Sequence, residues 1–321
     1  MLADVKYQSE AVRILQHLVQ GTWTDPLLLL GPSGVGKKFS VMQALQEMLC
    51  QGTRDDRCQC APCYQLARGL HVDVSTLSVS LEKTGINEVR ELIKDTDSHP
   101  SDAPFRCFIV DGVDYLNDKA GDALLKTLEE PPAYVRFILL AEDRAQVLPT
   151  IMSRCGVARY GLVPDEFILS VVQRYVPDLS KALVYTRMGE GSVGRAFSYA
   201  SAGKLTLRDQ TVKMMQAGVR RDFYTSFKLI DEMEDDLPTV ITFMQHVLHD
   251  VLIVDLDPMK LVNVDVPQVV REMKGKTSSQ AWQECAHKVN RLQKTVSKVQ
   301  RRELSVDLGF MVKTILAETF A

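Results

Sequence analysis

The stretch LLLLGPSGVGKK, residues 27–38, decides the fold of the first half of the chain. Its four leucines form a short apolar run that is typical of a buried parallel strand. The segment after them matches the pattern G-x-x-x-x-G-K, and apolar positions within residues 39–49 indicate a helix next. In this setting, backbone N–H groups and a helix N-terminus can cradle phosphate. The predicted phosphate-binding residues are Gly31, Ser33, Gly34, Val35, Gly36, Lys37 and Lys38.

The position after Lys37 departs from the motif. A hydroxyl is needed there to bind Mg²⁺, but the chain carries Lys38, whose ammonium has no lone pair and repels a cation. Asp111, at the end of the apolar run Phe108–Val110, is expected to hold Mg²⁺ through water. The sequence therefore predicts weakened ATP–Mg²⁺ binding. The plain alternative is a glycine-rich turn with a chance lysine.

Expected strands and helices alternate on either side of this stretch, and the pattern changes after about Tyr160. Four strands, expected within residues 27–30, 72–79, 105–110 and 137–141, alternate with helices, which favours a parallel sheet covered on both faces. Beyond Tyr160 only helices are expected, with Asp165 capping the first and a looser stretch at 255–267. The fold class is therefore α/β plus all-α.

Bulk composition sets further limits. The chain has 321 residues and a formal net charge of −3, so no global basic field recruits nucleic acid. The start of the chain does not resemble a secretory signal, and the longest apolar run is too short to span a bilayer. A cytoplasmic location without membrane attachment is expected.

Four of the seven cysteines crowd into residues 50–63. Cysteines grouped in this way in a reducing compartment indicate a metal site rather than disulfides. Four thiolates close a tetrahedral structural Zn²⁺ site with no open position for catalysis. The alternative is a set of free thiols on a surface loop. The predicted ligands are Cys50, Cys58, Cys60 and Cys63.

Several segments together resemble the clamp-loader subunits of the AAA+ ATPase class. They are GDALLKTLEEPP at 121–132, SRC at 153–155, GINEVREL at 85–92, the phosphate loop and the cysteine group. The resemblance implies three domains. These are a RecA-like AAA+ domain at 1–161 with the zinc module at about 50–63, a helical lid at 162–205, and a helical collar at 206–321 that joins subunits.

Within that family, the residues are more similar to the delta-prime type than to the gamma/tau ATPase type. Hydrolytic members carry Glu directly after the acidic strand, where this chain has Gly112. The family's sensor arginine is replaced by Gly194, with Arg195 one residue late and about 100° round a helix. A basic N-terminal segment that helps to hold adenine is absent, and residues 302–308 look like the end of delta-prime.

The resemblance also implies a role for Arg154, as an arginine finger that enters a neighbouring subunit's ATP pocket. The alternative is a surface arginine that pairs with an acid. The implied partners are gamma/tau-like and delta-like subunits, a sliding clamp, and primer–template DNA through the complex. Two rival functions stay open. One is an active, gamma/tau-like ATPase motor, and the other is a scaffold without nucleotide or finger.

A basic helix is expected near residues 288–302, with an apolar stripe through Val289, Leu292, Val296 and Val299. The plain interpretation is a solvated helix that packs within its own bundle. Subunit contact in the collar is the functional alternative, and direct DNA contact is a weaker one.

Overall fold

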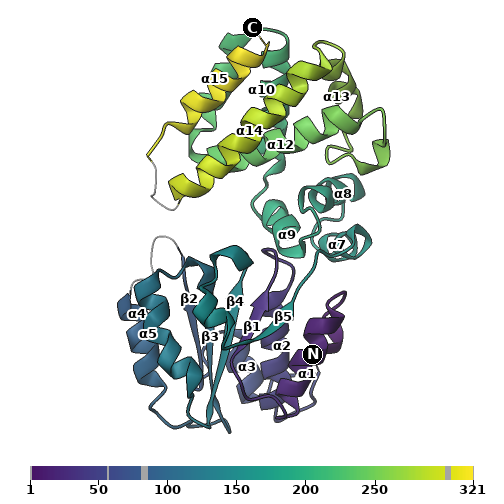
Figure 1. The fold of residues 1–321 in the computed structure, drawn as a ribbon. Helices are drawn as coiled ribbons and strands as arrows, with labels where there is room; N and C mark the ends of the chain where they lie inside the picture. The colour runs from purple at the N-terminus through teal and green to yellow at the C-terminus, as the bar shows by residue number, and fades with distance from the viewer. Residues whose placement is uncertain (1, 56–57, 81–85, 301–304, 321) are drawn as a thin grey trace. The chain divides into compact units, whose positions relative to one another are not determined.

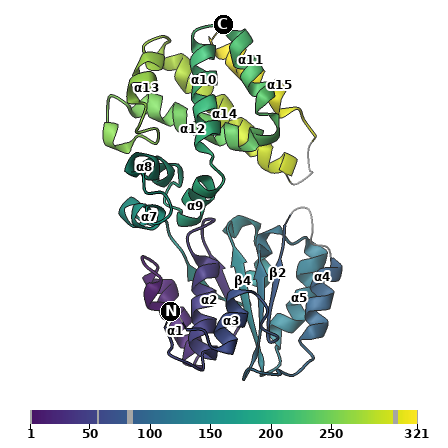
Figure 2. The same ribbon diagram turned by 180° about the vertical axis from the view of Figure 1, so that it is seen from behind.

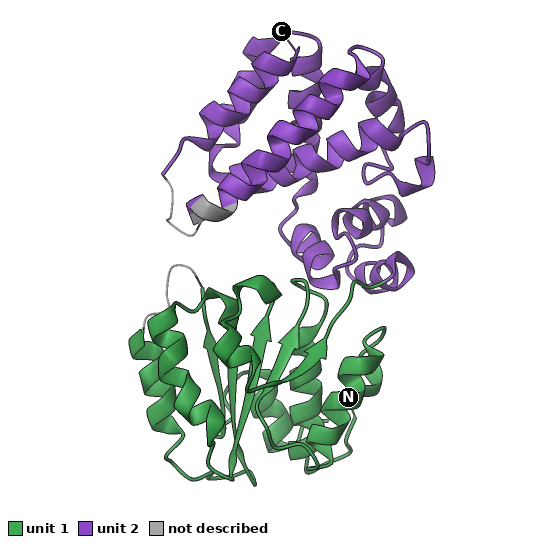
Figure 3. Cartoon of the chain, in the orientation of Figure 1, with its two compact units in different colours: residues 1–163 green, residues 164–321 purple. Residues whose placement is uncertain are grey.

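The computed structural model describes residues 2–55, 58–80, 86–300 and 305–320. The chain divides into two compact units, residues 1–163 and 164–321 (Figure 3). The first is α/β, and the second contains helices and no strand among its described residues, which confirms the predicted fold class. The division of the second unit into a lid and a collar stays a prediction.

The first unit is built on a five-stranded parallel sheet with the strand order β2-β3-β4-β1-β5 (Figure 1). The four predicted strands are confirmed, but β5, which pairs with β1, was not predicted. The strands are β1 Leu27–Leu30, β2 Val74–Ser78, β3 Arg106–Asp111, β4 Val135–Ala141 and β5 Gly156–Arg159.

Helices cover both faces of this sheet (Figures 1 and 2). α1, α2 and α3 lie on one face, and α4 and α5 lie on the other. Leu27 and Leu29 enter the first core, whereas Leu28 and Leu30 enter the second. Because β1 is buried on both faces, its sequence is an unbroken apolar run. The helices are η1 Leu2–Asp4, α1 Ser9–Val19, α2 Lys37–Leu49, α3 Ala61–Ala67, α4 Ile86–Asp95, η2 Val113–Tyr115, α5 Asp118–Glu129, η3 Arg144–Gln146 and α6 Pro149–Met152.

The parallel register gives the sheet two chemically different edges. Leu27 at the start of β1 lies opposite Gly156, and Leu30 at its end lies opposite Arg159. The phosphate loop therefore begins at the carboxyl edge. The segment that enters β5, which contains Arg154, lies at the amino edge.

The second unit consists of packed helices within its described residues. As expected, the stretch 255–267 carries only a short 3₁₀ turn before α13. Its helices are α7 Asp165–Val172, α8 Leu179–Met188, α9 Val193–Ser201, α10 Leu205–Val219, α11 Phe223–Glu232, η4 Glu234–Asp236, α12 Leu237–Ile253, η5 Pro258–Lys260, α13 Pro267–Lys274, α14 Ser279–Gln300 and α15 Leu308–Phe320.

Two expectations for this unit meet different outcomes. The expected cap at Asp165 is wrong, because Pro164 holds the N-cap position and the Asp165 carboxylate instead pairs with Arg187 at 2.7 Å. The apolar stripe of α14 is confirmed at Val289, Leu292 and Val296, which are buried. Lys288 on the same helix pairs with Glu284 and Glu318, within its own bundle. The basic residues 301 and 302, and with them part of the 302–308 match, lie outside the described residues.

Among the described helices, none combines the length and the apolar character that crossing a bilayer requires.

Candidate functional site

The phosphate loop connects β1 to α2, whose first residue is Lys37. The Lys37 side chain is buried, and its Nζ donates hydrogen bonds to the carbonyl oxygens of Gly31 at 2.6 Å and Pro32 at 2.8 Å. Burial lowers the pKa of Lys37, and the carboxylates around it, Glu142 first, oppose that change. The ammonium that the motif aims at phosphate is thus held by the carbonyls of its own loop.

Gln8 ties this loop to the end of the sheet. Its Nε2 donates to the carbonyl oxygen of Gly161 at 2.9 Å and to that of Val35 at 3.5 Å, and its Oε1 accepts from the Gly161 N–H at 3.0 Å. Gln8 is buried, so these bonds satisfy an amide that water cannot reach. They fix the position of the loop relative to the chain that leaves β5.

Lys38 lies in the first turn of α2, and its Nζ is 3.2 Å from Oδ2 of Asp111 at the end of β3. The motif needs a magnesium ligand at position 38 and a water-mediated one at Asp111. An ammonium now occupies the approach to that carboxylate and offers no lone pair. The residues present therefore do not fit Mg²⁺.

Gly112 and Asp114 stand where a hydrolytic site could place a base after Asp111, and both have structural roles instead. Gly112 has a φ of 93°, and a Cβ built on it would lie 2.5 Å from the carbonyl oxygen of Val79, so the backbone excludes a side chain there. Asp114 is buried, and its Oδ2 accepts the backbone N–H groups of Glu142 and Asp143 at 3.0 and 3.1 Å. Its carboxylate anchors the end of β4.

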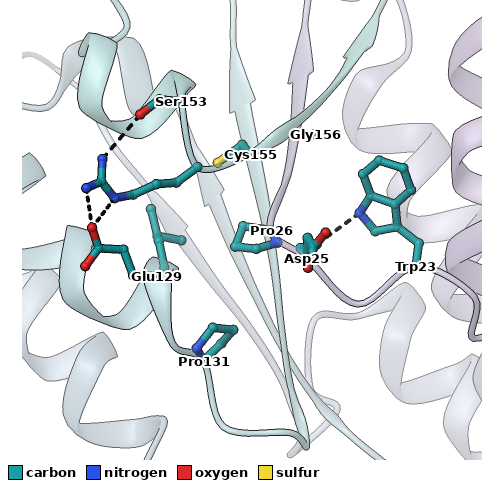
Figure 4. Close-up of a pocket in the computed structure, with 10 residues that line it drawn as sticks. Trp23, Asp25, Pro26, Glu129, Pro131, Ser153, Cys155 and Gly156 are labelled. Carbon is teal, nitrogen blue, oxygen red and sulfur yellow. Dashed lines mark hydrogen bonds and ion pairs between the residues drawn. The ribbon is translucent and has the colours of Figure 1, made fainter.

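Arg154 lies between α6 and β5, and its side chain is 30% exposed. Its Nε donates to Oε1 of Glu129 at 2.6 Å, and a terminal nitrogen pairs with the same oxygen (Figure 4). Another terminal nitrogen donates to the Thr150 carbonyl at 2.8 Å. Glu129 was not predicted as a site residue, because it lies 25 positions away and only the fold brings it close.

The same guanidinium borders a cavity of about 660 Å³ at the amino edge of the sheet. Leucine, tryptophan and proline side chains give it apolar walls, and carboxylates and the guanidinium provide its polar groups. It is lined by Trp23, Asp25, Pro26, Leu128, Glu129, Pro131, Ser153, Arg154, Cys155 and Gly156.

Arg154 and the chain's own phosphate loop lie at opposite edges of the sheet. At about 3.3 Å per residue, the four-residue strand β1 separates those edges by about 10 Å. The Arg154 side chain is in addition turned to Glu129. The structure thus brings Lys37, Lys38 and Asp111 together but does not bring Arg154 to them.

The four predicted cysteine ligands converge around the end of α2 and the start of α3. All four Sγ atoms lie within 4.8 Å of one another, with Cys50 at 3.5 Å from Cys58 and at 4.0 Å from Cys60. Zn–S bonds of about 2.3 Å in a tetrahedron hold sulfurs about 3.8 Å apart. The donor set therefore fits a zinc ion. α3 was not predicted from the sequence, yet it carries Cys63 and is preceded by Cys60.

Two of these thiols are polarised toward the thiolate that binds metal. The backbone N–H of Cys60, with the Thr53 side chain second, lowers the pKa of Cys58 to about 6. The backbone N–H of Cys63 likewise lowers the pKa of Cys60. Burial raises the pKa of Cys63. In the absence of metal, the cluster thus has thiolate character at its more exposed members.

In the second unit, Arg195 is engaged locally. Its terminal nitrogen lies 2.7 Å from Oε2 of Glu190, and Gly194 beside it belongs to α9. The arginine near the expected sensor position is thus paired within its own unit.

Comparison with known proteins gives consistent likenesses. Residues 7–161 match the family described as DNA polymerase III, delta subunit. The chain is 26% identical to the DNA polymerase III subunit delta' of Escherichia coli over 253 residues, covering 77% of this chain and 75% of that protein. It is 32% identical to the DNA polymerase III subunit gamma of Buchnera aphidicola over 148 residues, which is 46% of this chain and only 41% of that protein.

The fold has a solved counterpart in a DNA polymerase III gamma-subunit-related protein from Thermotoga maritima. The TM-score is 0.58 at 16% identity, over 97% of this chain and 98% of that one. At this identity the likeness concerns the fold alone.

The match over residues 7–161 and the likeness to delta' and gamma subunits both support the clamp-loader AAA+ family for this chain. Delta-prime subunits of DNA polymerase III are among its relatives, beside gamma and tau subunits.

Proposed function

We propose that this chain is a delta-prime-type subunit of a DNA polymerase III clamp loader. In this role it assembles with gamma/tau-like ATPase subunits and a delta-like subunit, and the complex uses ATP to place a sliding clamp on primer–template DNA. The chain supplies Arg154 to a neighbour's ATP site and hydrolyses little or no ATP itself. The family matches support a place among clamp-loader subunits.

The observation that carries the proposal is the placement of Arg154 at the edge of the sheet opposite its own phosphate loop. From that edge the guanidinium has no route to a nucleotide in its own pocket. It is partly exposed beside an open cavity, so a second molecule can reach it. An arginine in this position is suited to act in trans.

The chemistry of the side chain agrees with that role. A guanidinium is always charged and presents several donors in a rigid plane, which suits the oxygens of a phosphoryl group. During phosphoryl transfer an arginine finger stabilises the charge that spreads over those oxygens, and it accounts for about 10³- to 10⁵-fold in rate. For Arg154 to do this, it exchanges Glu129 for the neighbour's phosphate.

Weak hydrolysis by the chain itself is supported by three local arrangements. Lys37 is held by the carbonyls of its own loop, Lys38 is paired with Asp111, and the backbone at Gly112 excludes a side chain. Each removes a different part of a hydrolytic site: the phosphate contact, the metal, and the base. The zinc proposed at the four cysteines is structural, because four protein ligands leave no position for a substrate.

Reconstitution of the chain with candidate ATPase subunits, clamp and primer–template DNA tests the proposal. With Arg154→Ala, we expect the ATP site that Arg154 serves to lose about 10³-fold or more in turnover. Arg154→Lys should recover little, because an ammonium lacks the planar fork. Arg13→Ala, an exposed arginine on α1, is the matched control and should leave turnover unchanged.

Two results would contradict the proposal. An unchanged rate in the Arg154→Ala loader would leave the chain as a scaffold. Robust ATP turnover by the isolated chain, abolished by Lys37→Ala, would make it a motor of the gamma/tau type.

A further inference from the structure

The pocket at the carboxyl edge keeps its glycine-rich loop but holds an internal ion pair where a metal ion would approach. Lys38 and Asp111 are separated by 73 positions in the sequence and by the width of strand β4 in the sheet. The long lysine stem spans that distance and brings Nζ to 3.2 Å from Oδ2. The side chains are 51% and 35% exposed, so solvent and ions can reach the pair.

A divalent cation at this place would compete with the Lys38 ammonium for Asp111 and would be repelled by its positive charge. Mg²⁺ requires close to octahedral oxygen ligands, usually from one or two carboxylates together with phosphates and waters. Asp111 is the carboxylate in position, and one of its oxygens already accepts from the ammonium. The positive charge of Lys38 would also repel the incoming ion at short range.

Asp114, a second acidic group near Asp111, does not replace it. Asp114 is buried, and its Oδ2 is used by the N–H groups that follow β4. A metal ion at Oδ2 would have to displace these two backbone donors, and Oδ1 is buried away from solvent. Of these two carboxylates, Asp111 is the one open to solvent, and Lys38 is the residue that pairs with it.

We propose that the Lys38–Asp111 ion pair is what excludes Mg²⁺ from this pocket, so that a hydroxyl at position 38 alone creates a Mg²⁺–nucleotide site. This deepens the weak nucleotide site of the proposed function and rests on it, but it does not depend on Arg154. With the ammonium removed, Asp111 regains a free oxygen. A threonine or serine side chain then offers the ligand that the motif provides at this place.

The created site should bind without turning over. Gly112 still has no base to offer, and a Cβ there would collide with the carbonyl oxygen of Val79. Nucleotide binding and ATP hydrolysis thus separate, and the inference can be tested by binding alone.

Calorimetric titration of the full chain with ATP, in Mg²⁺ and in EDTA, is the test. For the native chain we expect no strengthening by Mg²⁺. For Lys38→Thr we expect at least tenfold tighter binding in Mg²⁺ than in EDTA. Lys38→Met, which removes the charge but supplies no ligand, should show less than a third of that gain. The double variant Lys38→Thr/Asp111→Asn should lose it.

Two outcomes overturn the inference. One is a native chain that already binds ATP at least tenfold more tightly in Mg²⁺. The other is a folded Lys38→Thr chain, verified by circular dichroism, that shows no dependence on Mg²⁺. Lys38→Ser provides a second hydroxyl variant if the threonine does not fold. ATP turnover of the native chain, measured in parallel, separates failure of this inference from failure of the proposed function.

Discussion

The guanidinium of Arg154 is held by a single carboxylate oxygen, Oε1 of Glu129, which it contacts through Nε and a terminal nitrogen. The two residues come from different elements, the end of α5 and the turn before β5, and meet at the amino edge of the sheet. The pair positions the guanidinium at the border of the cavity while leaving part of it exposed.

Breaking this pair should have little effect on stability. With side-chain exposures of 30% and 46%, the pair is screened by solvent, so Glu129→Gln should lower the free energy of unfolding by about 1 kcal/mol or less. Urea denaturation followed by circular dichroism measures this. A loss well above 2 kcal/mol would mean that the pair is structural, and a rate change in Arg154→Ala would then be ambiguous.

The wall of the same cavity depends on a close contact. A Cβ on Gly156 would lie 2.0 Å from Cζ2 of Trp23, so Gly156→Ala must displace the indole. We expect a loss of about 1–3 kcal/mol in the free energy of unfolding and a changed tryptophan emission. Gly161→Ala is the control, since a Cβ there meets nothing within 4 Å. Equal stability of the two variants would contradict the packing described here.

Metal removal should destabilise the segment that connects α2 and α3. We expect the purified chain to carry one zinc ion, measured by elemental analysis, and to lose it in Cys58→Ser. Cys155→Ser, outside the cluster, should keep it. Because a structural zinc contributes directly to folding, a strong chelator should lower the melting temperature of the native chain but not that of Cys58→Ser. A native chain that carries no zinc and whose melting temperature does not change with the chelator would contradict this prediction.

Asp73 should make the first unit sensitive to acid. Burial alone would raise the pKa of this carboxyl. The N–H groups of Ser101, Asp102 and Ala103, at 2.9, 2.7 and 2.8 Å, outweigh that effect and lower the pKa below the ordinary value of 3.8. Because the unfolded chain binds this proton more readily, the stabilisation is present above about pH 4 and is lost as the pH falls through the folded pKa.

The corresponding variant is Asp73→Asn. At pH 7 it should lower the free energy of unfolding by about 1–3 kcal/mol, and the difference from the native chain should shrink below pH 4. Asp102→Asn, exposed in the same loop, is the matched control and should behave like the native chain. A difference for Asp73→Asn that stays constant from pH 7 to pH 3 would show that the charge is not what the three N–H groups recognise.

Much of the first unit follows from local pattern, because buried parallel strands are unbroken apolar runs. β1 and the end of β3 could be predicted in this way. β5 could not, because its four residues include Gly156 and Arg159 and take their structure from pairing with β1. α3 was missed because it is only seven residues long and begins within the cysteine group.

The site shows the same division between chemistry and geometry. Residue types alone predicted that Lys38 cannot bind a metal ion and that four cysteines would gather. They could not predict that the Lys38 ammonium reaches Asp111, or that Glu129 holds Arg154, because these contacts join positions 73 and 25 residues apart. Nor could they reveal that the backbone at Gly112 excludes a side chain, since that depends on Val79, the residue that follows the neighbouring strand β2.

The two edges of the sheet give the first unit a direction, with the phosphate loop at one edge, the head, and Arg154 at the other, the tail. If such chains stand side by side with each tail toward the next head, every link in the row has the same direction, and one arginine serves one pocket. If the chain hydrolyses little ATP itself, as proposed, its arginine can serve a neighbour while its own pocket needs none from another chain. Such a chain is suited to the end of the row, where no further subunit supplies an arginine to its pocket.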